Sequence, residues 1–127
     1  MHLFGGYSRV NGKLTVLNNT VMNMKIENGK PIGEFNTGLL PLSPHGYCAA
    51  TLVYRNVIVA GGWSKGATNG VFLFNSRCQE WLQMPSLNRA RCSSALVVFN
   101  RSLVCIGGLV EDKWTTIVEQ LPVSMNV

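Results

Sequence analysis

Residues 62–66 read Gly-Trp-Ser-Lys-Gly, which is the Gly-x-Ser-x-Gly spacing of the turn that carries the nucleophilic serine of α/β-hydrolases. That chemistry needs a helix directly after the turn and a histidine later in the chain than the serine. Here the apolar run 71–74 predicts a strand after the turn, and both histidines, His2 and His45, precede Ser64. We therefore expect a loop at this position rather than a hydrolase site.

The four cysteines, Cys48, Cys78, Cys92 and Cys105, offer thiols for a metal site or for disulfides. No two of them have the Cys-x-x-Cys spacing and only two histidines are present, so we expect no metal site. Cys105 lies within the apolar run 103–106, a setting typical of a buried thiol. Reduced structural thiols in a cytoplasmic protein are therefore the prediction. No phosphate-binding or dinucleotide-binding loop indicates a cofactor.

The acidic pair Glu111-Asp112 provides the carboxylates that a glycosidase would use. The two residues are adjacent in a predicted loop, whereas glycosidase carboxylates face each other across a cleft. We therefore expect no catalytic residues in this chain.

Composition limits the classes of partner. The 127 residues leave room for one domain with one modest core. The net charge of +5 comes from basic residues that are scattered along the chain, so we expect no nucleic-acid partner. No stretch approaches the ~18 apolar residues of a membrane helix, so no membrane association is expected.

An internal repeat organises the chain. A short apolar run ends in a glycine pair three times, at Gly5-Gly6, Gly61-Gly62 and Gly107-Gly108. The second and third pairs are 46 residues apart, and a shift of that size also aligns Phe35 with Trp81 and Val71 with Ile117. The first interval is longer, and its excess lies before Phe35 in a region with the turn signals Asn11-Gly12 and Asn28-Gly29.

Each period predicts four short strands rich in Val, Ile, Leu and Phe. The expected strands are 49–54, 57–60, 71–74 and 80–83, then 95–99, 103–106 and 116–120. Four strands per period with glycine punctuation predict an all-β fold built from the blades of a β-propeller. The glycine pairs would allow close backbone approach, and Phe35 and Trp81 would be apolar plates between neighbouring blades.

Residues 84–91, 94–98 and 106–108, with the Trp81 position and Ile117-Val118-Glu119, resemble the kelch repeat. The resemblance implies an incomplete kelch-type β-propeller of about two and a half to three four-stranded antiparallel blades. It divides the chain into a partial blade (1–40), a complete blade (41–86) and a partial blade (87–127). We expect apolar faces to be exposed on the end sheets, and therefore a fragment or truncated product of a longer protein.

The resemblance also implies a binding face. In kelch propellers the loops that join the second strand to the third, and one blade to the next, emerge at one face that grips a partner segment, which is acidic in several cases. The residue types Tyr, Trp and Arg in these loops are typical of interface hot spots. The candidate contact residues are Tyr7, Arg9, His45, Tyr47, Trp63, Lys65, Asn69, Arg89, Arg91, Lys113 and Trp114.

The function implied by the resemblance is protein–protein interaction without catalysis. Cytoplasmic kelch-like adaptors use the propeller to select a substrate, while a separate BTB domain recruits a cullin ubiquitin ligase; these residues contain no BTB segment. An actin-binding or scaffold kelch protein is the alternative. A galactose-oxidase-like copper enzyme is a remote one, because its tyrosine and histidine ligands cannot be assembled from three tyrosines and two histidines.

Overall fold

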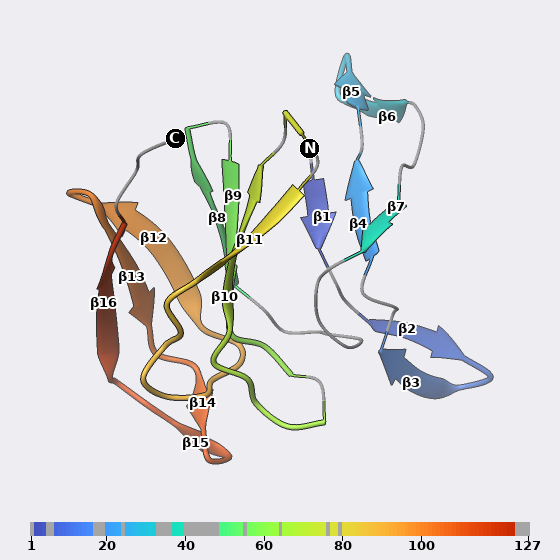
Figure 1. Cartoon of the computed structure of the whole chain (residues 1–127). Helices are drawn as coiled ribbons and strands as arrows, with labels where there is room; N and C mark the ends of the chain where they lie inside the picture. Colours follow the sequence, from blue (N-terminus) through green and yellow to red (C-terminus); the bar gives the residue numbers. More distant parts are fainter. Residues whose placement is uncertain are drawn as a thin grey trace. The chain divides into compact units, whose positions relative to one another are not determined.

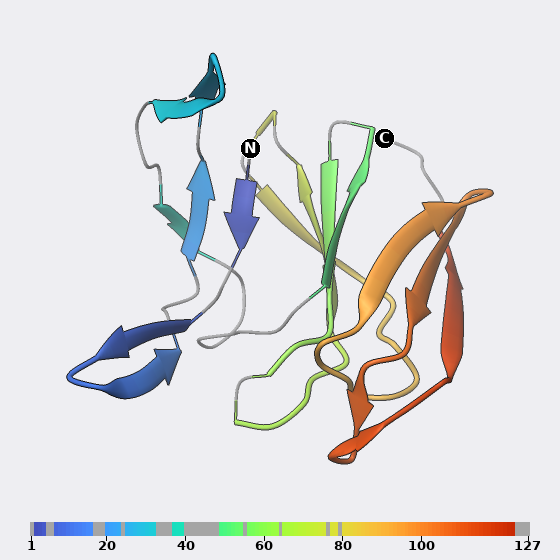
Figure 2. The ribbon, with the colours of Figure 1, turned by 180° about the vertical axis from the view of Figure 1, so that it is seen from behind.

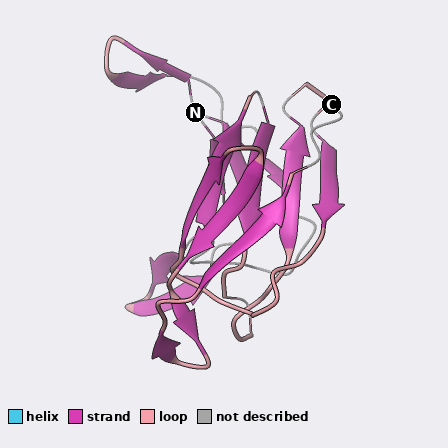
Figure 3. Cartoon of the chain, turned by 90° about the vertical axis from the view of Figure 1, so that its left-hand side faces the viewer, coloured by secondary structure: helices cyan, strands magenta, loops and turns pink. Residues whose placement is uncertain are grey.

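The structure, a computed structural model, contains β-strands and loops (Figure 1; Figure 3). It describes residues 2–4, 7–16, 20–23, 25–32, 37–39, 49–54, 56–63, 65–75, 77–78 and 80–123. In this part of the chain no helix is long and apolar enough to cross a membrane. The chain divides into two compact units, Met1–Gly46 and Tyr47–Val127, which are described separately.

The first unit contains one antiparallel sheet and two hairpins. The sheet has the order β1 (His2–Phe4), β4 (Thr20–Asn23) and β7 (Thr37–Leu39). The hairpins are β2 (Tyr7–Val10) with β3 (Lys13–Val16), and β5 (Lys25–Glu27) with β6 (Lys30–Ile32). Their turns, Asn11-Gly12 and Asn28-Gly29, have positive φ at both residues, as tight hairpins require. The two hairpins therefore account for the longer first repeat.

The second unit contains the complete four-stranded sheet that the sequence predicts. Its order is β8 (Ala49–Val53), β9 (Asn56–Ala60), β10 (Val71–Asn75) and β11 (Glu80–Met84), all antiparallel. A further sheet follows, with the order β12 (Ala95–Phe99), β13 (Ser102–Ile106) and β16 (Val118–Pro122). The small hairpin of β14 (Leu109–Val110) and β15 (Lys113–Trp114) lies between β13 and β16 in sequence.

The last repeat is one residue longer than a shift of 46 assumes. The Gly61 N–H donates to the Gly70 carbonyl at 2.9 Å, whereas the Gly107 N–H donates to the Ile117 carbonyl at 3.2 Å. Ile117 therefore takes the place of Gly70, and Val118 takes the place of Val71. The predicted alignment of Val71 with Ile117 is wrong because the β14–β15 hairpin lengthens this loop.

The two sheets of the second unit pack face to face, with β8 beside β12 (Figure 2). Ile58, Ala60, Val71 and Leu73 from the β8–β11 sheet share one core with residues of the next sheet, which are Leu96, Val98, Leu103, Cys105 and Leu121. Residues on the opposite face of β9 and β10, such as Val57 and Phe72, are also buried. Burial on both faces explains why these strands are continuously apolar in sequence.

Trp81 occupies the β11 position that the repeat predicts for an aromatic plate. Its ring is half-buried and tilted at 45° against Phe74 of β10, with ring centroids 5.0 Å apart. This pair covers part of its own sheet. Phe35, the corresponding residue in the first repeat, lies outside the described residues, as do Gly5 and Gly6.

The later glycine pairs lie where backbones meet closely. Gly61 has φ +61°, and a Cβ there would lie 2.5 Å from the Arg91 carbonyl oxygen. Gly62 donates its N–H to that same oxygen at 2.7 Å. Gly108 lies close to the same linker from the other sheet, because a Cβ there would lie 2.5 Å from the Cys92 carbonyl oxygen. The missing side chains of these glycines therefore leave room for the backbone of the segment that links the two sheets.

We predict that Gly61→Ala lowers the free energy of unfolding by more than Gly12→Ala does. Gly12 also has a positive φ, +76°, but a Cβ there would meet no atom within 4 Å. Gly12→Ala should therefore cost only the backbone strain of about 1–2 kcal/mol, while Gly61→Ala adds a steric overlap. Denaturant unfolding of both variants tests this, and equal losses would contradict it.

Candidate binding site

The segment between β11 and β12, residues 85–94, is hydrogen-bonded first to the loop that joins β9 to β10. The Leu87 N–H donates to the Asn69 carbonyl at 2.9 Å, and the Asn69 side-chain amide donates back to the Leu87 carbonyl at 3.2 Å. The Arg91 N–H donates to the Thr68 carbonyl at 3.0 Å. The Leu87 side chain is buried in the shared core. The linker is thus bound along the 63–70 loop.

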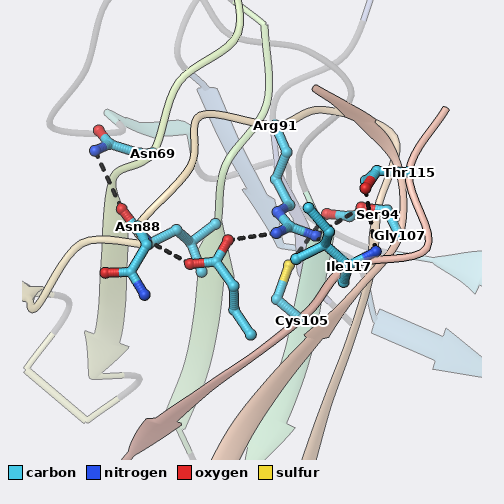
Figure 4. Close-up of polar contacts among 10 residues, drawn as sticks. Asn69, Asn88, Arg91, Ser94, Cys105, Gly107, Thr115 and Ile117 are labelled. Atoms are coloured by element: carbon cyan, nitrogen blue, oxygen red, sulfur yellow. Dashed lines mark hydrogen bonds and ion pairs between the residues drawn. The ribbon is translucent and has the colours of Figure 1, made fainter. Parts of the chain in front are cut away.

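The same linker is also bound to the β14–β15 hairpin and to Glu119 of the β12–β13–β16 sheet. Cys92 and Leu109 exchange two backbone hydrogen bonds, of 3.2 and 2.9 Å. The Asn88 N–H donates to Oε1 of Glu119, which lies on β16 (Figure 4). These hydrogen bonds hold the linker backbone against Thr68 and Asn69, against the β14–β15 hairpin and against Glu119, so the linker is fixed in place rather than a free loop.

Arg91 is the main side-chain contact of the linker. Its Nη1 donates to the Gly107 and Ile117 carbonyls at 2.9 Å each, and its Nη2 forms an ion pair with Glu119 (Figure 4). The side chain is 0% exposed, and Glu119 is buried as well. A buried carboxylate needs such a partner, because an unpaired charge in the core is strongly destabilising.

The prediction that Arg91 contacts a partner protein is therefore wrong. Its guanidinium lies inside the protein and donates to groups of its own chain. The sequence position of Glu119 indicates the burial of Arg91, because Glu119 alternates with exposed residues on β16 and so faces the core. A buried carboxylate requires a buried cation, and Arg91 is that cation.

A cavity of about 650 Å³ lies where three segments of the second unit meet. Its walls come from the 63–67 loop, from residues 88–92 of the linker and from residues 109–112 of the β14–β15 hairpin. Three of the predicted binding loops therefore lie together at one place. Trp63 forms an antiparallel bridge with Ala67, and the strand β10 follows as predicted.

Two of the predicted contact residues, Trp63 and Arg89, line this cavity. Lys65, Asn69, Lys113 and Trp114 are exposed but are not among its lining residues. Tyr7 and Arg9 lie on β2 of the first unit, where only the backbone is described, and His45 and Tyr47 lie outside the described residues.

Glu111 and Asp112 are candidate binding residues that were not predicted as such from the sequence. Both line the cavity and both are exposed. They form the two-residue turn of the β14–β15 hairpin, with φ values of 49° and 60°. Their place in the sequence indicated a binding role, since this acidic pair lies in a loop that joins the second strand of a blade to the third. With Arg89, the cavity offers one cation and two carboxylates to a ligand.

Three of the four cysteines lie in the described part of the chain. Cys78, Cys92 and Cys105 are free thiols there, and Cys105 is buried as predicted, with its thiol 3.4 Å from the Ser94 hydroxyl. Among the same residues, no three His, Cys, Asp or Glu side chains gather as a metal site would require. Cys48 lies outside the described residues.

Comparison with known proteins identifies a sequence motif in this chain and a solved structure with a similar fold. Residues 44–88 match the family described as Kelch motif. A search of curated proteins finds no match. Among solved structures, that of YjhT is similar with a TM-score of 0.67 and 16% sequence identity. The similarity covers 96% of this chain and 43% of YjhT. At that identity the likeness concerns the fold alone, and this chain spans less than half of that protein.

We predict that Arg91→Met lowers the free energy of unfolding by about 3–5 kcal/mol, because it leaves the buried Glu119 carboxylate without its cation. Arg89→Met, the same change two residues away on an exposed side chain, should stay within about 0.5 kcal/mol of wild type. The double variant Arg91→Met/Glu119→Leu should recover part of the loss. Urea unfolding distinguishes these, and equal stability of the two single variants would contradict the structural role.

Proposed function

We propose that this chain, a kelch-repeat protein whose sheets are blades of an incomplete kelch-type β-propeller, is a non-catalytic module that binds a segment of a partner protein. The observation that carries the proposal is the cavity where the loops of two neighbouring blades and their linker meet. Cavities that a rigid scaffold forms between loops are where proteins commonly bind ligands.

The rigidity of the linker supports binding. Arg89 and Asn88 lie on a segment whose backbone is hydrogen-bonded to both blades, so little conformational entropy is lost when a partner docks there. Trp63 adds an aromatic surface on the opposite loop. Aromatic side chains and arginines are the groups that contribute most at protein interfaces.

The charges of the cavity indicate the chemistry of the partner segment. An acidic side chain of the partner would pair with Arg89, since a guanidinium binds a carboxylate with two parallel hydrogen bonds. The same segment would present backbone N–H groups or a basic side chain to Glu111 and Asp112. The proposed partner is therefore a mixed-charge peptide segment that contains at least one carboxylate.

The cellular role proposed here is substrate recognition in a kelch-like adaptor of a cullin ubiquitin ligase. This role rests on the resemblance of the repeat to that group of proteins. The ligase would be recruited by a BTB domain outside these residues. The cytoplasm is the compartment that this role implies.

A peptide library displayed on phage and selected on the immobilised chain tests the binding function. We predict that selected peptides carry an acidic residue and lose at least about tenfold in affinity, near 1.4 kcal/mol, for Arg89→Ala. Arg77→Ala is the matched control, because Arg77 is exposed but is not among the cavity-lining residues. Selection of no peptide, or equal effects of the two variants, would refute the proposal.

A further inference from the structure

One carboxylate holds the linker on both sides of Arg89, the exposed arginine at the cavity. Oε1 of Glu119 accepts a hydrogen bond from the Asn88 N–H, and Oε2 pairs with Nη2 of Arg91 (Figure 4). Glu119 lies on β16, 31 positions after Asn88 and 28 positions after Arg91. Arg89 therefore follows directly after a backbone group that is bound to a distant strand.

The peptide group that joins Leu87 to Asn88 is bound at both of its polar ends. Its N–H donates to Glu119, and its carbonyl oxygen accepts from the Asn69 side-chain amide at 3.2 Å (Figure 4). The Leu87 side chain is only 2% exposed, in the shared core. Because a peptide group is planar, two such contacts fix its orientation. The direction in which the backbone enters Arg89 is fixed with it.

The two oxygens of Glu119 meet different requirements. Oε2 faces the Arg91 guanidinium, which is 0% exposed and needs a negative charge beside it. Oε1 faces a neutral backbone N–H, for which an uncharged acceptor oxygen would also serve. Substitutions can therefore separate the contact that stabilises the fold from the contact that orients the linker.

We propose that Glu119 is a positioning residue for the cavity, which orients Arg89 toward a partner by holding the peptide group between Leu87 and Asn88. The inference rests on the proposed binding function and adds to it a residue that is not among the cavity-lining ones. Glu119 acts through the linker backbone and does not touch the partner. A side chain that is oriented before docking loses less conformational entropy on binding, so loss of this anchor lowers the affinity.

Two double variants separate positioning from stability. Arg91→Met/Glu119→Leu leaves no acceptor for the Asn88 N–H, whereas Arg91→Met/Glu119→Gln keeps an amide oxygen there. The leucine variant should be the more stable of the two, because a buried amide with an unpaired group is costly. The glutamine variant should nevertheless bind at least about ten times more tightly to an acidic peptide selected on the wild-type chain. Urea unfolding and isothermal titration calorimetry measure the two quantities.

Amide hydrogen exchange, followed by NMR, tests the anchor without a partner. The Asn88 N–H should exchange at least about ten times faster in the leucine variant than in the glutamine variant. Ile58→Val is the control for stability, since Ile58 is a 0% exposed core residue on β9. It should lower the free energy of unfolding and leave both the peptide affinity and the exchange of the Asn88 N–H close to wild type.

Circular dichroism shows whether each variant folds. If a double variant does not, Glu119→Asp replaces the pair, because it keeps a charge for Arg91 but withdraws the oxygen from the Asn88 N–H; its affinity should fall at least about tenfold. Affinity that follows stability across the variants, or equal exchange of the Asn88 N–H in the two double variants, overturns this inference and leaves the proposed function standing. A library that yields no peptide refutes the proposed function and this inference with it.

Discussion

The buried ion pair between Arg91 and Glu119 is the interaction on which the second unit depends most. Glu119 lies on the inner face of β16, among side chains that are otherwise apolar, and its charge is tolerated because the Arg91 guanidinium reaches it. The same guanidinium donates to the carbonyls of Gly107 and Ile117. One side chain thus connects the linker with the glycine turn and with the third strand of the last blade.

That connection has consequences for the candidate site. Residue 91 is held in the core, while Arg89, two positions earlier, is exposed at the cavity. The Arg91 N–H donates to the Thr68 carbonyl, and the Arg91 carbonyl accepts from the Gly62 N–H and lies close to Gly61. In one short segment, Arg91 therefore stabilises the fold while Arg89 is the residue proposed to bind a partner. The contacts of Arg91 position Arg89.

Many of the strands and turns could be predicted from sequence, because apolar runs indicate strands and Gly-Gly or Asn-Gly pairs indicate the turns that end them. The strands β8 to β11 and the two early hairpins follow directly from such signals. The one-residue offset at Val118 could not, because it depends on which backbone groups pair after a loop of unpredicted shape. The same limit applies to Arg91 and Arg89, whose residue type is identical and whose opposite burial depends on Glu119, 28 positions after Arg91.

The loops of this fold change length without disturbing the sheets that carry them. The first repeat accommodates two whole hairpins, and the last accommodates an extra residue, while the strand ladders on either side keep their pairing. The changes in length are thereby confined to loops, and they occur at both ends of a sheet, because β2–β3 follows β1 whereas β5–β6 follows β4. Proteins of this fold can therefore acquire new surfaces through changes in loop length while their strands keep the same pairing.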